Sequence, residues 1–208
     1  MIDETIFRNV LKEIKENPKN AEDIIDSFSD NQFKSKTKVL NYVDKLDILS
    51  KESEIIIFGS WYGSILIPGL AEKVKRITCI DLDDTVLKIA KNRLFKHYNN
   101  VDYIAADVFE KDRERYWTTK LFINTSCEHM PSMKEWPYWS NVKNDCYFAF
   151  TSNNMYNIEG HVNCVNSMDE FKQQLPNNSK VLFEDDITDE RGTRFLLVGK
   201  IVATNQNH

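Results

Sequence analysis

The sequence lacks the features that mark several classes of protein. Its four cysteines form no C-x-x-C pair, which argues against a zinc cluster or a disulfide framework. It contains no run near the roughly 18 uncharged apolar residues that a membrane span needs, and its first residues alternate charged and apolar positions instead of forming a signal peptide. A net charge of -5 gives no global reason to bind a polyanion. We therefore expect a cytoplasmic protein that binds neither membranes nor nucleic acid.

The composition is that of a globular chain. Apolar residues make up 41% and charged residues 28% of the 208 positions, which is enough to bury a core without disulfides or metals. No internal repeat, low-complexity tract or linker divides the sequence. We predict a single domain over residues 1–208, with a helical extension at 1–50 and a core at 54–202.

The pattern of apolar residues changes near Glu54. Before it, helical spacing predicts helices at 3–16 and 21–28 and a third helix that follows Ser35. After it, apolar runs and amphipathic segments alternate. The runs predict strands at 54–59, 76–81, 101–107, 120–126 and 145–152, helices at 64–74 and 83–98 and after Ser167, and a hairpin at 180–202. This alternation predicts a doubly wound α/β fold, with a mostly parallel sheet covered by helices on both faces and an antiparallel hairpin at its end.

Polar residues follow each predicted strand, where sheets of this kind bind cofactors. The first strand ends in the turn Gly59-Ser60-Trp61-Tyr62-Gly63, which resembles a G-x-G-x-x-G turn but has Trp61 at the middle glycine. Asp81 ends the second strand, near the spacing of about 20 residues at which an acidic residue meets ribose hydroxyls. It could also be a solvated turn carboxylate. Asp83 is interpreted as a helix cap.

These elements together resemble the class I S-adenosylmethionine-dependent methyltransferases. The resemblance covers about residues 54–200 and rests on the order of elements, the turn at 59–63, Asp81, Asp107 in "AADVF" and the terminal hairpin. It extends to small methyltransferase-like proteins of phages and bacteria. It implies a Rossmann-like sheet of seven strands and S-adenosylmethionine as the cofactor. The chain departs from the pattern at Ile57, where many members carry an acidic residue, and at Trp61.

The resemblance also assigns the cofactor contacts. Asp107 would accept a hydrogen bond from the adenine amino group, and the backbone N–H of Val108 would meet the ring. Trp61 can replace the glycine because this cofactor has no pyrophosphate that the backbone must approach closely. The predicted cofactor-binding residues are Lys36, Gly59, Ser60, Trp61, Tyr62, Gly63, Asp81, Leu82, Asp107, Val108 and Asn124.

Two of these contacts have alternative interpretations. The ring of Trp61 or Tyr62 could stabilise the sulfonium by about 0.5–2 kcal/mol, or Trp61 could pack on the first helix. Lys36, in the segment that precedes the third predicted helix, could pair with the methionine carboxylate of the cofactor, or it could be an ordinary exposed lysine.

The acceptor of the methyl group should lie near the residues that follow the fourth and fifth strands. Glu128 and His129 follow the fourth strand, and His161 lies in the polar loop after the fifth. We predict all three as catalytic residues, with a structural role for Glu128 and His129 as the alternative. Further candidates for acceptor contacts are Asn153, Asn154 and Asn163, while Trp136, Tyr138 and Trp139 could wall the pocket or belong to the core.

Motifs that are missing narrow the predicted reaction. The tetrad N-P-P-[YF] of methyltransferases that act on amino groups of DNA bases is absent, and "NTSC" stands in its place. No carboxylate triad follows the fourth strand, so we predict no metal site. Cys127 lacks the Pro-Cys context of a cytosine-5 nucleophile.

The predicted function is in-line methyl transfer from S-adenosylmethionine to a small-molecule acceptor. The alternatives are an S-adenosylmethionine-binding protein that is non-catalytic or runs another reaction, and a nicotinamide-dependent oxidoreductase. The sequence leaves the oligomeric state open.

Overall fold

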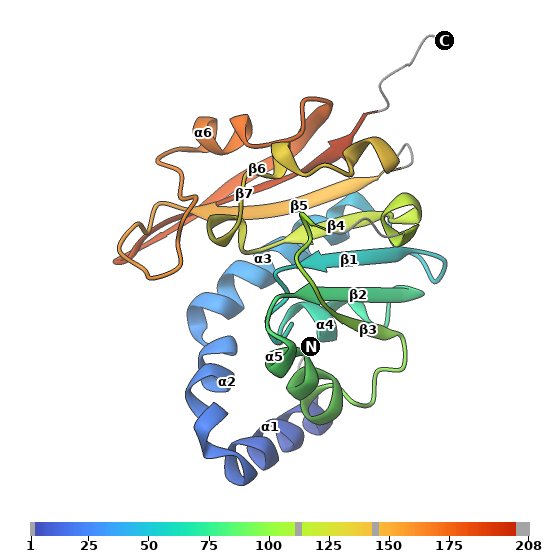
Figure 1. Cartoon of the computed structure of the whole chain (residues 1–208), viewed down its shortest axis with the longest axis vertical. Coiled ribbons are helices and arrows are strands. Elements are labelled where there is room, and N and C mark those ends of the chain that lie inside the picture. Colours follow the sequence, from blue (N-terminus) through green and yellow to red (C-terminus); the bar gives the residue numbers. More distant parts are fainter. Residues whose placement is uncertain (1–2, 111–113, 143–145, 203–208) are drawn as a thin grey trace. The chain divides into compact units, whose positions relative to one another are not determined.

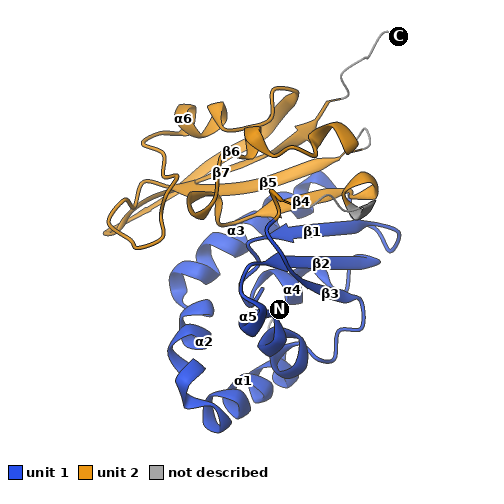
Figure 2. Ribbon diagram, viewed as in Figure 1, with its two compact units in different colours: residues 1–107 blue, residues 108–208 orange. Residues whose placement is uncertain are grey.

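A computed structural model describes residues 3–110, 114–142 and 146–202. The chain forms two compact units, residues 1–107 and residues 108–208 (Figure 2). The described residues form seven strands, in the order β3-β2-β1 in unit 1 and β4-β5-β7-β6 in unit 2 (Figure 1). This mixed order confirms the predicted fold class, while the assignment of one domain to residues 1–208 stays a prediction. No helix in the described part of the chain is long and apolar enough to cross a membrane.

Unit 1 begins with three helices, α1 (Glu4–Glu16), α2 (Ala21–Ser27) and α3 (Asp30–Leu46). Asp3 caps α1, because its Oδ1 accepts a hydrogen bond from the Ile6 N–H at 2.8 Å. The predicted start of the third helix is wrong. Ser29 and not Ser35 is its N-cap, and the Ser29 Oγ accepts from the Gln32 N–H. Ser35 and Lys36 therefore lie inside the helix and are buried.

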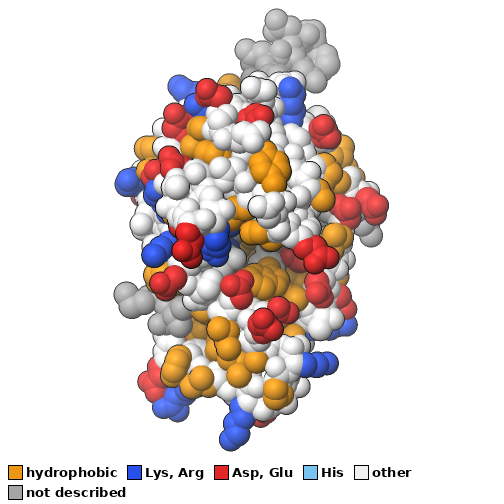
Figure 3. Space-filling model, turned by 90° about the vertical axis from the view of Figure 1, so that its left-hand side faces the viewer, with side chains coloured by type: hydrophobic (Ala, Val, Ile, Leu, Met, Phe, Trp, Pro, Cys, Tyr) orange, Lys and Arg blue, Asp and Glu red, His pale blue; other side chains and the backbone are white. Residues whose placement is uncertain are grey.

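The N-terminal helices bury one apolar stripe and expose another. Ile6, Ile24, Val39 and Val43 are fully buried. Apolar side chains also reach the surface among charged ones on the face shown in Figure 3. The exposed members on α1, α2 and α3 are Phe7, Leu11, Ile25 and Phe33. The three helices therefore contribute both to the core of unit 1 and to its apolar surface.

The sheet of unit 1 consists of three parallel strands. They are β1 (Glu54–Phe58), β2 (Arg76–Asp81) and β3 (Val101–Ala105), with β2 between the other two. Four of the five residues of β1 are buried, as expected for a strand covered on both faces. The carboxyl ends of these strands lie at one edge of the sheet, which places the turn after β1 beside the turn after β2.

The helices that connect these strands are shorter than predicted. The helix α4 (Leu66–Leu70) contains Pro68, which lacks a backbone donor, and Gly69, which has a low helix propensity. The helix α5 (Asp84–Ile89) continues into a π-helical turn, η2 (Ala90–Leu94), which ends where the Phe95 N–H donates to the Ala90 carbonyl at 2.8 Å. The pattern of apolar residues predicted neither the end of α4 nor the end of α5.

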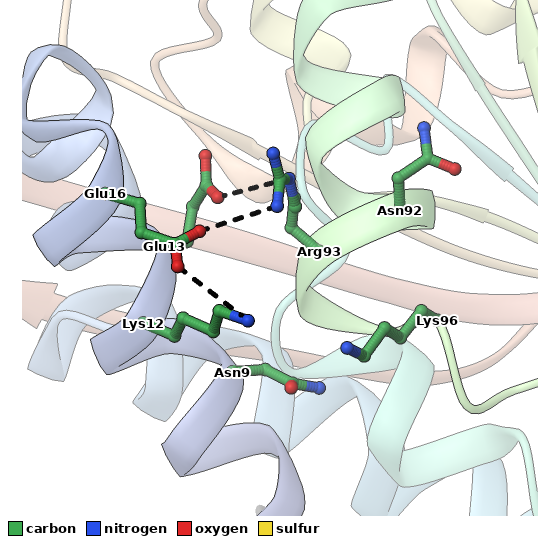
Figure 4. Close-up of a pocket in the computed structure, with 7 residues that line it drawn as sticks. All are labelled: Asn9, Lys12, Glu13, Glu16, Asn92, Arg93 and Lys96. Carbon is green, nitrogen blue, oxygen red and sulfur yellow. Dashed lines mark ion pairs between the residues drawn. The ribbon is translucent and has the colours of Figure 1, made fainter.

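A shallow polar hollow lies between α1 and η2 (Figure 4). Its wall includes Glu13 and Glu16, and Arg93 forms ion pairs with both at 3.6 Å. Glu13 is buried, and its Oε1 also accepts a hydrogen bond from Asn17. Because both carboxylates already pair with Arg93, the hollow is a packing feature that joins α1 to η2.

Unit 2 holds the remaining four strands. These are β4 (Leu121–Asn124), β5 (Tyr147–Asn153), β6 (Ser179–Asp189) and β7 (Gly192–Ile201). β4 pairs with β5 in parallel, whereas β7 pairs antiparallel with both β5 and β6. The connecting elements are η3 (Glu114–Thr118), η4 (Cys127–His129), η5 (Met133–Glu135), η6 (Trp139–Asn141) and α6 (Met168–Gln173). The predicted hairpin is confirmed, with Asp189 opposite Gly192 at its turn.

The aromatic cluster after β4 packs around a buried tryptophan in unit 2. Trp136 is buried, and its Nε1 donates to the Val108 carbonyl at 2.9 Å. Its ring centroid lies 4.9 Å from that of Tyr116 and 4.6 Å from that of Trp139. Edge-to-face contacts at these distances stabilise a packed core. Trp136 therefore belongs to the core, whereas Tyr138 and Trp139 are half-buried.

The Asp83 cap yields the first prediction. Its Oδ1 accepts from the N–H groups of Thr85 and Val86 at 2.8 and 3.1 Å. Asp83→Ala should lower the free energy of unfolding by about 1 kcal/mol, and Asp83→Asn by only a few tenths, as measured by urea denaturation. The control is Asp84→Ala, which removes the exposed ion pair with Lys88 and should cost about 0.3–0.5 kcal/mol. Equal losses in the two alanine variants would contradict the cap.

Candidate functional site

The turn after β1 has an unusual backbone. Gly59, Trp61 and Gly63 have φ angles of 55°, 47° and 69°. This left-handed region is open to glycine but strained for a residue with a Cβ. The turn closes when the Gly63 N–H donates to the Ser60 carbonyl at 2.8 Å. The turn therefore has the left-handed form that glycine adopts easily, with a tryptophan at its centre.

Asp81 ties this turn to the end of β2. Its Oδ2 accepts from the Trp61 N–H at 2.7 Å, and its Oδ1 accepts from the Asp83 N–H at 3.0 Å. A carboxylate has about four acceptor positions, so the two backbone bonds leave capacity for two more donors. The side chain is half-buried, which keeps it within reach of a ligand. Asp81 therefore both holds the turn and retains acceptor capacity.

Three other predicted residues of unit 1 surround this turn. The Nζ of Lys36 lies 5.9 Å from the ring centroid of Trp61 and donates to Gln32 Oε1 at 2.6 Å. Tyr62 is buried beside Trp61, and burial raises the pKa of its hydroxyl to about 12. Leu82 is 74% exposed directly after Asp81. The structure thus brings Lys36 to the turn from within α3 and not from a segment before the helix.

The remaining predicted cofactor contacts are Asp107, Val108 and Asn124. Asp107 is half-buried at the end of unit 1. Val108 is buried, and its carbonyl accepts from Trp136. The side chain of Asn124 is fully buried, and its groups bond to Ser126, Met130 and Met133. These bonds account for the Asn124 amide within unit 2, so its role as a cofactor contact stays a prediction.

In unit 2 the predicted catalytic residues gather after β4. Glu128 is 2% exposed, in the turn η4. Its Oε1 accepts from Asn153 Nδ2 at 2.6 Å and from Arg194 at 3.1 Å. Asn153 is the last residue of β5, and Arg194 lies opposite it on β7. A buried charge is stable only with such partners, so three elements hold this carboxylate.

His129 and His161 lie beside this carboxylate. Their ring centroids are 4.6 Å apart and their planes are nearly perpendicular. His129 Nδ1 lies 3.0 Å from the Gly160 carbonyl, and His161 Nδ1 lies 2.9 Å from the Met155 carbonyl. Desolvation is the largest cause that lowers the pKa of His161. The structure therefore brings together the three residues predicted to be catalytic.

The asparagines predicted as acceptor contacts instead hold the loop after β5. Asn153 is fully buried and bonds to Glu128 and to the Met155 N–H. Asn154 accepts from the Thr193 N–H at 2.7 Å. The amide of Asn163 donates to the Met130 carbonyl and to Gln174. Their side-chain groups are engaged within unit 2, which favours a structural role for all three.

Sequence reasoning missed Arg194. It lies in the run "TRFLLVGKIV", which was interpreted only as an apolar strand, and it is 66 positions from Glu128. A single arginine inside an apolar strand is itself a signal, because a buried guanidinium needs an acidic partner. The sequence does not say which acid that is.

Cys127, the possible nucleophile, is unsuited to that role. It is buried, and burial raises the pKa of its thiol well above the ordinary value. Burial also raises the pKa of Cys79, to about 12. Since the thiolate is the nucleophile, such thiols react slowly.

Comparisons with known proteins agree with the fold. No family model matches the sequence. The chain is 34% identical over 94 residues to the ubiquinone biosynthesis O-methyltransferase of Nitrosomonas europaea, a match that covers 44% of this chain and 39% of that protein. The chain thus spans well under two thirds of the curated relative that it matches.

Solved structures extend the likeness to most of the chain. The N-methyltransferase NodS from Bradyrhizobium japonicum aligns with a TM-score of 0.63 and 16% identity, over 84% of this chain and 99% of that one. Geranyl diphosphate C-methyltransferase from Streptomyces coelicolor, solved in complex with Mg2+, geranyl diphosphate and S-adenosyl-L-homocysteine, aligns with a TM-score of 0.65 and 10% identity, over 81% and 79%. These likenesses confirm the fold that the resemblance to class I methyltransferases implied.

The buried ion pair of Glu128 and Arg194 yields a prediction. Arg194→Met leaves a buried carboxylate without its charged partner and should lower the free energy of unfolding by about 3–5 kcal/mol in urea denaturation. The double variant Glu128→Met with Arg194→Met should be more stable than the single variant, because it leaves no unpaired charge.

The matched control is the pair of Lys172 and Glu184, also in unit 2, at 2.6 Å but half-exposed. Lys172→Met should cost about 0–1 kcal/mol. If Arg194→Met lowers the free energy of unfolding by no more than Lys172→Met does, the buried pair does not contribute the stability assigned to it.

A third prediction concerns the thiols. Cys164 is half-buried, whereas Cys79, Cys127 and Cys146 are buried. Iodoacetamide at mildly alkaline pH should label Cys164 first and the other three only when urea unfolds the chain, as followed by peptide mass spectrometry. Rapid labelling of Cys127 in the folded chain would restore it as a candidate nucleophile.

Proposed function

We propose that this chain, which has the fold of the class I S-adenosylmethionine-dependent methyltransferases, transfers a methyl group from S-adenosylmethionine to a small-molecule acceptor. The observation that carries the proposal is the geometry of Asp81 beside the turn after β1. The three similar proteins described above are each named as methyltransferases, which supports the activity. The bound S-adenosyl-L-homocysteine of one of them supports the cofactor.

The residues of unit 1 fit the adenosine part of the cofactor. Asp81 retains two acceptor positions after its two backbone bonds, which matches the two donors of a vicinal diol. The exposed Leu82 offers an apolar surface next to that carboxylate, suited to one face of the base. When bound, S-adenosylmethionine supplies an electrophilic methyl group on a sulfonium.

The same turn does not fit a dinucleotide. A pyrophosphate needs close approach to the backbone, which the middle glycine of the motif allows. Trp61 stands at that position, and its side chain occupies the space next to the backbone. The nicotinamide alternative therefore loses support from the turn as well as from the names of the similar proteins.

Lys36 is proposed to pair with the methionine carboxylate. Its ammonium group lies beside the Trp61 ring, at the turn that the cofactor would contact. A charge-assisted hydrogen bond to a carboxylate there would be stronger than one between neutral groups. Lys36 would take this role from inside α3 and not from the segment that was predicted to precede the helix.

The predicted catalytic residues of unit 2 are proposed to include a general base. Methyl transfer requires an acceptor atom with a free lone pair, held in line with the sulfonium. An acceptor that starts as a hydroxyl or ammonium must first lose a proton, and a neutral imidazole is suited to accept it. Desolvation lowers the pKa of His161, which favours the neutral form of its ring. The net charge of -5 and the missing N-P-P-[YF] tetrad favour a small molecule over nucleic acid.

Asp81 provides the test. Asp81→Ala should weaken binding of S-adenosyl-L-homocysteine at least tenfold, since it removes a pair of charge-assisted hydrogen bonds worth about 1.5–3 kcal/mol each. Asp81→Asn, which keeps one acceptor oxygen, should lie between the alanine variant and the natural chain. Isothermal titration calorimetry measures all three, and circular dichroism checks that each variant is folded.

Asp84→Ala is the control, because Asp84 is exposed two positions beyond Leu82 and pairs with Lys88. It should leave the affinity unchanged, and NADH should not bind to any form. The proposal is wrong if the folded Asp81→Ala variant binds S-adenosyl-L-homocysteine as tightly as the natural chain does.

A further inference from the structure

Three side chains of unit 2 lie in the arrangement of a metal site. One potential ligand atom from each of Glu128, His129 and His161 lies within 4.8 Å of the other two. Two of these residues come from the turn η4 and the third from the loop after β5. Ligand atoms around one metal ion are separated by distances somewhat shorter than this, so small side-chain adjustments would suffice.

The histidines are oriented as metal-binding histidines usually are. In each ring Nδ1 faces a backbone carbonyl, that of Gly160 for His129 and that of Met155 for His161. If Nδ1 carries the proton, it donates to that carbonyl and Nε2 keeps its lone pair. A carbonyl that fixes the tautomer and the ring orientation in this way is the usual outer partner of a ligand histidine.

Glu128 contributes a carboxylate oxygen that lacks a protein partner. Its Oε1 accepts from Asn153 and Arg194, but its Oε2 is buried and makes no hydrogen bond within the described residues. A buried carboxylate oxygen without a donor is costly, so such an atom points to a missing cation or donor. The Nε of Arg194 is also buried without a partner in the described part of the chain.

The backbone around the cluster is already held in place. The Glu128 carbonyl accepts from the N–H groups of Val162 and Asn163, each at 2.9 Å. Gly160, at a φ of 80°, allows the tight turn that brings its carbonyl to His129. The loop that carries His161 is thus tied directly to the residue that supplies the carboxylate.

We propose that Glu128, His129 and His161 bind one divalent transition-metal ion of the Zn2+ class. Two imidazoles and one carboxylate suit zinc, cobalt or iron, whereas Mg2+ and Ca2+ prefer oxygen ligands throughout. Three protein ligands leave at least one coordination position open, as in catalytic sites. His129 is exposed and His161 half-buried, so that position is accessible from solvent.

The metal gives the predicted catalytic residues a different task. They would contact the acceptor through the ion and would not exchange protons with it directly. A metal ion favours loss of the proton from a bound hydroxyl group, which is what a hydroxyl acceptor requires. This link to the acceptor rests on the proposed function, whereas metal binding itself rests on unit 2 alone.

The test is a titration of the full, tag-free chain after treatment with EDTA and desalting. Zn2+ and Co2+ should each bind once per chain in calorimetry, and Co2+ should give the visible absorption of a site with nitrogen ligands. His129→Ala and His161→Ala should each weaken binding by about 10–100-fold or more. Mg2+ should not compete. His97→Ala, in unit 1, is the matched control and should leave the affinity unchanged.

Glu128→Gln tests the carboxylate, but it also disturbs a buried ion pair. The exposed His129 therefore provides the decisive variant, since its loss should not affect folding. The inference is overturned if neither Zn2+ nor Co2+ saturates the chain, or if both histidine variants bind as the natural chain does. If the chain binds S-adenosyl-L-homocysteine but no metal, only the metal site is contradicted. If it binds metal but no S-adenosyl-L-homocysteine, only the proposed function is contradicted.

Discussion

A carboxylate that follows a buried strand must find donors for its oxygens, and both units are organised around one such group. Asp81 accepts hydrogen bonds from two backbone N–H groups. That of Trp61 lies in the turn after β1, and that of Asp83 lies just after β2. Glu128 accepts from the side chains of Asn153 and Arg194. The donors come from different segments in each case, so the carboxylate fixes how those segments meet. Both carboxylates keep acceptor capacity beyond these bonds, which makes each of them a candidate ligand contact.

The features that could be predicted from the sequence are local ones. Asp3, Asp83 and Ser167 each accept from an N–H two or three positions ahead, so the residues that decide the cap lie next to one another in the chain. The strands were found because their residues are apolar throughout, as both faces are covered. The hairpin was found because Gly192 follows a polar turn between two apolar runs. These local signals do not depend on tertiary contacts with distant parts of the chain.

The features that could not be predicted depend on distant partners. Ser29 and Ser35 have the same capping chemistry, and only the packing of α3 decides which of them begins the helix. Lys36 was placed before that helix for the same reason. Arg194 pairs with Glu128 across 66 positions, and other acidic residues of the chain were equally plausible partners on sequence alone. Asn153, Asn154 and Asn163 could each have contacted a ligand or held the loop by hydrogen bonds, because Asn is common in both roles. Tertiary contacts decided each of these cases.

Trp61 shows how a strained residue can indicate the chemistry of its ligand. A residue with a Cβ in the left-handed region costs about 1–3 kcal/mol, which glycine would avoid. The bond to Asp81 and the ring of Tyr62, whose centroid lies 5.3 Å away, hold it there. The side chain therefore contributes something that glycine lacks, and the Lys36 Nζ lies 5.9 Å from the centroid of its ring. A cation already near the ring disfavours a second one at the same place. This arrangement supports the proposed pairing of Lys36 with the methionine carboxylate over a contact between the Trp61 ring and the sulfonium.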